Sequence, residues 1–87
     1  MPRFLIILTR TPSFSTDTLA GHRAHIAILR EAGQLLMYGP FSDSTGGAYL
    51  MHAESLAEAV RFAHADPLIK SGASTCVVKE WQIRENG

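Results

Sequence analysis

Two histidines and a distant aspartate are the residues of this sequence best suited to chemistry. His25 lies in the apolar stretch 24–29, His22 precedes it by three residues, and Asp66 stands in the only Asp-Pro step of the chain. An imidazole exchanges protons near neutral pH, and a carboxylate partner determines which ring nitrogen carries the proton. His25 and Asp66 therefore predict a site for proton transfer, provided that folding brings the two side chains together.

Both residues also have a purely structural explanation. His25 could be a hydrogen-bonded histidine of the core, and Asp66 could cap the short helical turn that begins at Pro67, because Asp before Pro suits the start of a helix. Capping does not exclude a contact with histidine, since a carboxylate has two oxygens. His22, His25 and Asp66 could together bind a metal. No cluster of Cys or Glu supports that reading, and we predict neither a metal nor a cofactor.

Glycine, proline and aromatic residues around a predicted loop are candidates for contact with a ligand. Gly39-Pro40 and Gly46-Gly47 flank this loop, where the backbone could approach a ligand closely, although a sharp turn requires the same residue types. Tyr38, Phe41 and Tyr49 could line an aromatic pocket, although aromatic residues of strands more often pack in the core. No glycine-rich phosphate loop favours a nucleotide. The candidate substrate-binding residues are His22, Tyr38, Gly39, Pro40 and Gly47.

The apolar pattern predicts two helices and four strands in the order βαββαβ. The first strand is apolar on both alternating faces, which is typical of a strand covered on both sides. At 100° per residue, His22, His25 and Ile28 fall on the inward side of the first helix or at its margin. Ser55 and Glu58 match a capping box at the start of the second helix. The expected strands are 4–9, 35–38, 48–53 and 75–83, and the expected helices are about 15–32 and 55–65, with one further turn at 67–71.

This order of elements predicts an α+β fold of the ferredoxin-like type, an antiparallel four-stranded sheet with two helices on one face. The helices would cover only one side of a first strand that is apolar on both sides. An uncovered apolar patch of several hundred Å² is unusual on a monomer. We therefore expect a homodimer, or a higher homo-oligomer, that packs sheet against sheet with closed symmetry.

Length and charge narrow the classes of function. The 87 residues suit one domain, 1–87. Eight Lys and Arg residues balance eight Asp and Glu residues, so no basic field favours nucleic acid or an anionic membrane. The apolar run 4–8 is too short for a signal-peptide core or a membrane span. Cys76, the one cysteine, is expected to be a packed thiol, as in a reducing cytoplasm. We expect a cytoplasmic protein that binds a small molecule.

Several short motifs occur in a fixed order over nearly the whole chain. They are His25-Ile26-Ala27-Ile28-Leu29, the stretch from Gly33 to Pro40, Gly46-Gly47, the stretch from Glu54 to Ala59, Ala65-Asp66-Pro67-Leu68 and Gly72. Together these motifs resemble the YciI-like (YCII-related) family. The resemblance implies the dimeric α+β barrel superfamily, and it places a candidate active site at a helix histidine and the aspartate of the Asp-Pro step, which are His25 and Asp66 here. Relatives often carry an arginine shortly before that histidine, where this chain has His22 and Arg23.

The resemblance implies an activity only in outline. One branch of the family resembles a dehydrochlorinase of chlorinated hydroxyhydroquinones, and more distant relatives include muconolactone isomerases and small monooxygenases, but a shared fold alone transfers none of these activities. We expect a cofactor-independent lyase or isomerase that uses His25 and Asp66 on a cyclic or hydroxylated substrate. The alternative is a noncatalytic ligand-binding or accessory domain.

Overall fold

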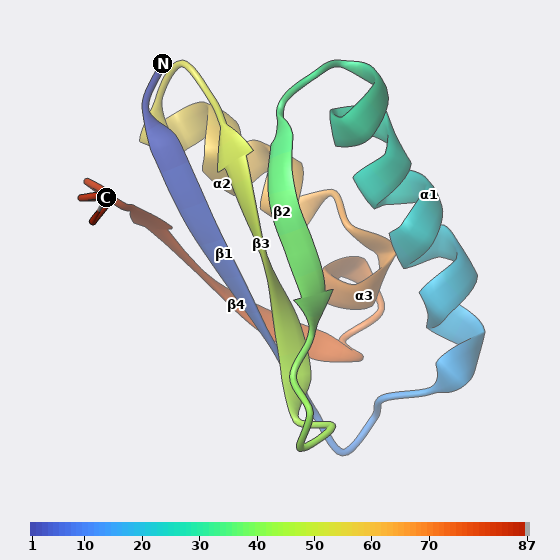
Figure 1. The fold of residues 1–87 in the computed structure, drawn as a ribbon. Coiled ribbons are helices and arrows are strands. Elements are labelled where there is room, and N and C mark those ends of the chain that lie inside the picture. The colour runs from blue at the N-terminus through green and yellow to red at the C-terminus, as the bar shows by residue number, and fades with distance from the viewer. Residues whose placement is uncertain (87) are drawn as a thin grey trace.

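Four strands form one antiparallel sheet, and the helices cover one of its faces (Figure 1). The computed structural model describes residues 1–86. The strands lie in the order β2-β3-β1-β4, so the first and third strands of the chain are central. This confirms the predicted ferredoxin-like α+β fold. The elements are β1 (Arg3–Arg10), η1 (Thr16–Thr18), α1 (Leu19–Glu31), β2 (Leu35–Pro40), β3 (Gly46–His52), α2 (Leu56–His64), α3 (Pro67–Lys70) and β4 (Ser74–Glu80).

The helix ends follow local capping chemistry. Ser55 Oγ accepts a hydrogen bond of 3.1 Å from the backbone N–H of Glu58, which begins α2 as the sequence predicts. The Glu58 side chain does not complete the capping box, because its carboxylate lies 3.5 Å from Gln34 Nε2 instead. Pro67 occupies the first turn of α3, where a missing N–H costs nothing, and Asp66 precedes it as the N-cap.

The core lies between the sheet and the helices. Alternate residues of β1 are buried on the helix side, namely Phe4, Ile6 and Leu8. They contact a cluster that includes Ile26 of α1 and Ala63 of α2. Burying a large apolar side chain stabilises a fold by about 1.5–3 kcal/mol, so this layer holds the three helices against the sheet.

The direction of Ile28 and several element boundaries differ from the sequence-based predictions. The helix α1 begins at Leu19 rather than near residue 15, and β3 begins at Gly46 rather than at Ala48. Ile28 was expected to face inward, but its side chain is 59 % exposed, because α1 contacts the core through a narrower stripe that includes Ile26 and Leu29. The last strand ends at Glu80 rather than at Ile83. Beyond Glu80 the segment keeps two contacts with Arg3 of β1, the hydrogen bond from Trp81 N to Arg3 O and an exposed ion pair between Arg3 and Glu85.

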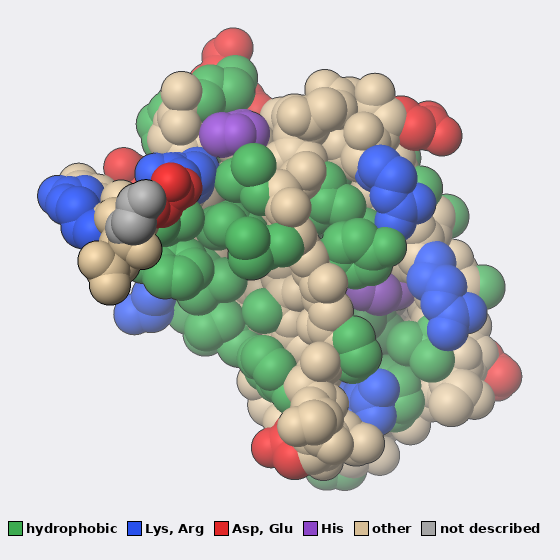
Figure 2. All heavy atoms as spheres, in the orientation of Figure 1, with side chains coloured by type: hydrophobic (Ala, Val, Ile, Leu, Met, Phe, Trp, Pro, Cys, Tyr) green, Lys and Arg blue, Asp and Glu red, His purple; other side chains and the backbone are tan. Residues whose placement is uncertain are grey.

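The opposite face of the sheet is apolar and uncovered by any element of the described chain. Figure 2 looks onto this face and shows hydrophobic side chains spread across it. Strand register places Met37 beside Leu50 and Val77 beside Ile7, and Met37 and Val77 are 62 % and 51 % exposed. We call the surface formed by Leu5, Ile7, Met37 and Val77 the open sheet face. Leu50 lies on the same side of the sheet, but its neighbours already bury it to 3 % exposure. Separately, no helix within residues 1–86 is long and apolar enough to cross a membrane.

Candidate active site

A cavity of about 330 Å³ lies between α1 and the paired strands β2 and β3. Its wall contains all five residues that the sequence pointed to as ligand contacts, which come from α1, from the end of β2 and from the start of β3. Side chains of the core, such as Leu8 and Ile26, form its apolar base. The five residues are His22, Tyr38, Gly39, Pro40 and Gly47.

Gly46 and Gly47 are required first of all by strand pairing. A Cβ atom on Gly46 would lie 1.8 Å from the carbonyl oxygen of Leu8, and the φ of Gly46 is +155°. A Cβ atom on Gly47 would lie 2.7 Å from the carbonyl oxygen of Gly39. Only glycine allows these backbones to approach so closely. The two residues belong to a strand rather than to a turn, and they leave a bare stretch of backbone in the cavity wall.

His22, rather than His25, is the partner of Asp66. His22 Nδ1 lies 2.6 Å from Asp66 Oδ2, and the Asp66 side chain is completely buried. The other carboxylate oxygen, Oδ1, accepts a bond of 2.9 Å from the backbone N–H of Leu68, so Asp66 also caps α3. The predicted capping role of Asp66 is confirmed, but its histidine partner is His22 rather than His25.

The close packing of α1 against α3 brings His22 to Asp66. Gly21 faces Pro67, and a Cβ atom on Gly21 would lie 3.0 and 3.2 Å from two ring carbons of Pro67. A larger residue at position 21 would push the two helices apart. The close contact between Gly21 and Pro67 therefore sets the distance between their chain neighbours, the imidazole of His22 and the carboxylate of Asp66.

The predicted contact between His25 and Asp66 is wrong. His25 Nε2 lies 2.8 Å from the carbonyl oxygen of Phe62, and its ring stacks on the Phe62 ring with centroids 3.9 Å apart. His25 is 8 % exposed and is not part of the cavity wall. The physical reason is that three residues along a helix leave about 60° between two side chains, which directs His25 to α2 and His22 to α3.

The hydrogen bonds determine which nitrogen of His22 is basic. A carboxylate only accepts hydrogen bonds in its ionised form, so Nδ1 of His22 carries the hydrogen that points at Asp66. Nε2 of neutral His22 then has a free lone pair, and it has no protein partner within the described part of the chain. A carboxylate that orients an imidazole and stabilises its protonated form is a standard arrangement for general acid–base catalysis.

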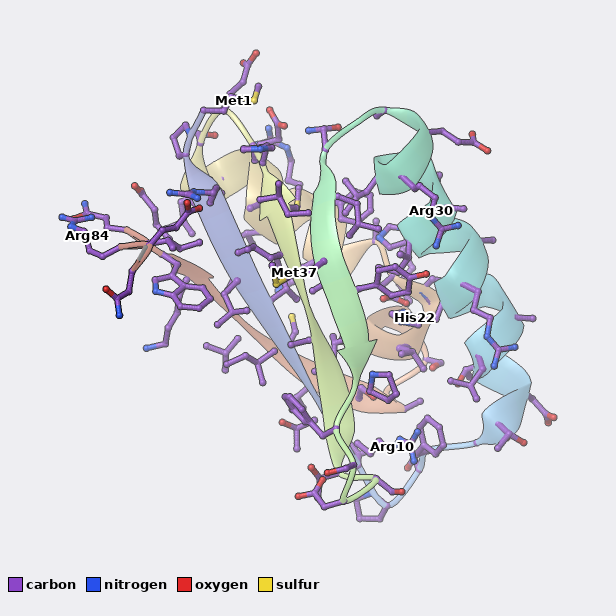
Figure 3. The ribbon with its side chains drawn as sticks, in the orientation of Figure 1. Met1, Arg10, His22, Arg30, Met37 and Arg84 are labelled. Atoms are coloured by element: carbon purple, nitrogen blue, oxygen red, sulfur yellow. The ribbon has the colours of Figure 1, made fainter. Side chains whose placement is uncertain are left out.

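His22 is accessible from the cavity side of the molecule. Its side chain is 21 % exposed. Figure 3 places it between α1 and β2, and at the same position in Figure 2 a histidine side chain is visible at the bottom of a hollow. The sequence had counted His22 among the candidate substrate contacts but not as the proton-transfer group. The one local signal for that role was Gly21, which permits close helix packing just before His22.

Two other titratable groups near Asp66 are held in their neutral forms. Burial, with a smaller contribution from the negative charge of Asp66, raises the pKa of the Tyr49 hydroxyl. The same two causes raise the pKa of the Cys76 thiol. A thiol that stays protonated is a poor nucleophile. These shifts favour His22 over Cys76 as the reactive group, in line with the prediction of Cys76 as a packed thiol.

The Tyr49 hydroxyl is buried without a hydrogen-bond partner among residues 1–86. An unsatisfied buried hydroxyl costs about 1–3 kcal/mol. We expect Tyr49→Phe to raise the free energy of unfolding by about 1 kcal/mol, measured by urea denaturation. Tyr38→Phe is the control, because Tyr38 is exposed and its hydroxyl accepts a bond from Arg30. A loss of stability in Tyr49→Phe would show that this hydroxyl has a partner after all.

The described residues contain no group of three His, Cys, Asp or Glu side chains arranged to hold a metal ion. The triad considered from sequence, His22, His25 and Asp66, is not assembled, because His25 Nε2 is bonded to Phe62.

Comparisons with known proteins agree with the fold and give it a family context. A family model described as "YCII-related domain" matches residues 2–82. The uncharacterised protein YjpA of Bacillus subtilis (strain 168) is 44 % identical over 85 residues, which are 98 % of this chain and 100 % of that protein. The structure of 5-chloro-2-hydroxyhydroquinone dehydrochlorinase from Burkholderia phenoliruptrix AC1100, in complex with 2,5-dihydroxybenzoquinone, superposes with a TM-score of 0.79. It is 28 % identical and covers 92 % of this chain and 93 % of its own.

Proposed function

Because the chain belongs to the YCII-related family, we propose that it is a lyase or isomerase in which His22, oriented by Asp66, moves a proton on a small cyclic, hydroxylated substrate. The observation that carries this proposal is the 2.6 Å contact between His22 and a fully buried carboxylate, at the wall of a cavity. The similar dehydrochlorinase, whose structure is a complex with the hydroxylated ring 2,5-dihydroxybenzoquinone, supports the class of substrate.

One histidine can perform every proton step of such a reaction. On a chlorinated hydroquinone, His22 Nε2 takes a proton from a hydroxyl group and returns it to the ring carbon that bears chlorine. His22 then takes a second hydroxyl proton, a C=O bond forms, the C–Cl bond breaks and chloride leaves. The sum is loss of HCl with no external oxidant, and Asp66 stabilises the imidazolium at each stage. Without a leaving group, the first step alone is an isomerisation.

The test uses two readouts on the whole chain. The purified protein is incubated without oxygen with 5-chloro-2-hydroxyhydroquinone, and released chloride is measured. In parallel, hydroxylated rings without chlorine are incubated in D₂O, and deuterium incorporation at ring carbons is followed by NMR. We expect at least one of the two reactions to exceed the rate with His22→Gln protein. If neither chloride release nor ring exchange depends on His22, the proposal of proton transfer is wrong.

Binding without turnover is the second candidate function. The observation that favours it is the mostly apolar wall of the cavity, in which His22 is the one histidine among the described residues. An accessory or ligand-binding domain would bind 2,5-dihydroxybenzoquinone, and the amide NMR signals of β2 and α1 would shift on titration. His22-dependent chloride release and ring exchange would both stay at the background rate.

We further propose that two copies of the chain associate through the open sheet face. Figure 2 shows hydrophobic side chains spread across this face. Met37 and Val77, which are both more than half exposed, lie on its two edge strands, β2 and β4. Contiguous apolar surface of this kind on a soluble domain marks an association site. A two-fold axis would bring the same face of both copies together.

A charge on the open sheet face should prevent this association. We expect Val77→Lys to raise the dimer dissociation constant by at least about 100-fold, because an unpaired charge is costly to bury. Analytical ultracentrifugation measures the mass. Ile28→Lys is the matched control, since Ile28 is equally exposed but lies on α1. The proposed interface is wrong if both variants keep the mass of the parent protein, or if the parent is a monomer at high concentration.

A further inference from the structure

Three arginines line the hollows beside His22, although the chain as a whole has equal numbers of basic and acidic residues. Arg10, at the end of β1, and Arg23, on α1, both belong to the wall of the main cavity. A smaller recess of about 270 Å³ adjoins it, shares His22 and Arg23 with it, and ends at Arg30. Figure 3 labels Arg10 and Arg30 on either side of His22.

No acidic side chain from residues 1–86 lines either hollow. The nearest carboxylate is that of Asp66, which is completely buried behind His22 and already bonded to it. The whole chain has eight basic and eight acidic residues. The positive charge at the cavity is therefore a local feature, and clefts lined by one sign of charge concentrate ligands of the opposite sign.

Arg10 is held in place yet keeps most of its donors. One N–H donates a bond of 3.1 Å to the backbone oxygen of Ser44, and the guanidinium lies 4.1 Å from the centroid of the Phe14 ring. A guanidinium has five N–H donors in a planar fork that fits a carboxylate. Because the side chain is already ordered, it would lose little conformational entropy on binding an anion.

Arg23 and Arg30 differ in whether their guanidinium groups are free to bind a ligand. Arg30 donates a bond to the Tyr38 hydroxyl and lies over the Tyr38 ring, so its guanidinium is already engaged within the protein. Arg23 has no hydrogen bond or ion pair to another residue within the described range. The two arginines that remain available to a ligand in the main cavity are Arg10 and Arg23.

We infer that the ligand of this cavity is a small cyclic organic anion whose carboxylate binds between Arg10 and Arg23, with its ring on the apolar base beside His22. This inference rests on the proposed function and names its substrate class. The cavity volume of about 330 Å³ suits one substituted ring. Leu8, Leu19 and Leu68 in the wall favour an apolar body with a single charged group over a fully polar ion such as phosphate.

A pair of ligands of equal shape tests the charge requirement. 2,5-Dihydroxybenzoate and the neutral 2,5-dihydroxybenzamide are titrated into the whole protein, with binding followed by amide NMR shifts. We expect the carboxylate to bind at least about tenfold more tightly than the amide at about 20 mM salt, and the difference to shrink at about 200 mM. Equal affinity of the two ligands would overturn the inference. So would tighter binding of inorganic phosphate than of 2,5-dihydroxybenzoate.

Matched variants locate the anchor. Arg10→Gln and Arg23→Gln should each weaken binding of 2,5-dihydroxybenzoate about tenfold and leave binding of the amide unchanged. Arg61→Gln is the control, because Arg61 is an exposed arginine of α2 outside both hollows. An equal loss in Arg61→Gln would mean nonspecific charge attraction and would also overturn the inference. Arg10→Lys keeps the positive charge but removes the planar guanidinium. Its affinity for 2,5-dihydroxybenzoate therefore shows which of the two properties of Arg10 the ligand requires.

His22→Gln separates this inference from the proposed function. We expect this variant to retain the preference for the carboxylate, because Arg10 and Arg23 supply it. Selective anion binding without any His22-dependent reaction would support the inference and contradict the proposed chemistry. If neutral and anionic rings bind with equal affinity and both react in a His22-dependent way, the proposed chemistry is supported and the inference is contradicted.

Discussion

Replacing His22 by glutamine is expected to lower turnover by about 100-fold to 10,000-fold, the usual contribution of a positioned acid–base group. Gln keeps a donor that can reach Asp66 but has no nitrogen that accepts and releases a proton near neutral pH. His22 lies at the cavity wall and is partly exposed, so the fold should survive. Chloride release or ring exchange measures turnover, and thermal unfolding together with an NMR spectrum verifies the fold.

His25→Gln is the matched control for this substitution. The two histidines lie on the same helix, and only His22 is part of the cavity wall. We expect His25→Gln to keep turnover within about threefold and to lose about 1–2 kcal/mol of stability, because the stacking on Phe62 is removed. The reverse result, an inactive His25 variant beside an active His22 variant, would restore the assignment that the family resemblance suggested from sequence.

Asp66→Asn is expected to lower turnover by about 100-fold, because it changes which ring nitrogen of His22 carries the proton. If the amide NH₂ faces His22, Nδ1 must accept a hydrogen bond, the proton moves to Nε2, and the basic lone pair no longer faces the cavity side. The ¹⁵N chemical shifts of His22 report this change directly. A variant with wild-type turnover and an unchanged His22 tautomer would show that the carboxylate has no positioning role.

The same substitution should cost stability. Asp66 is completely buried and has two partners, His22 and the Leu68 N–H, of which Asn keeps only the second in full. We expect a loss of about 1–3 kcal/mol in the free energy of unfolding, measured by urea denaturation. Asp43→Asn is the control, because Asp43 is exposed and bonds only to Thr45 in its own turn. The control should change stability by less than about 0.5 kcal/mol.

Most of the fold could be predicted because its causes are local. The apolar alternation of β1, the cap at Ser55 and the Asp-Pro start of α3 each act over a few residues, and each appears in the structure where the pattern indicates. Four strands and two long helices in this order have few ways to pack. The predicted placement of residues 39, 40 and 47 at a ligand-sized cavity depends on the same reasoning, because strand pairing brings the two glycine segments together.

The choice between the two histidines could not be predicted in this way. His22 and His25 are both compatible with the inward side of α1, and the one local difference between them, Gly21 beside His22, does not by itself reveal which histidine meets Asp66. Their partners come from other elements, since Phe62 lies on α2 and Asp66 caps α3. The distance of each imidazole from Asp66 depends on how α1 lies over both helices, and that depends on contacts such as Gly21 against Pro67.

The sequence by itself determined the elements, their order, the apolar second face of the sheet and the three residues that could form a proton-transfer site. Local hydrogen bonding and side-chain periodicity encode all of these. Only the tertiary structure decided which imidazole meets the carboxylate, that His25 packs against Phe62, and that arginines of β1 and α1 meet at one cavity. Those facts depend on the relative positions of elements far apart along the chain, which packing of the whole core establishes.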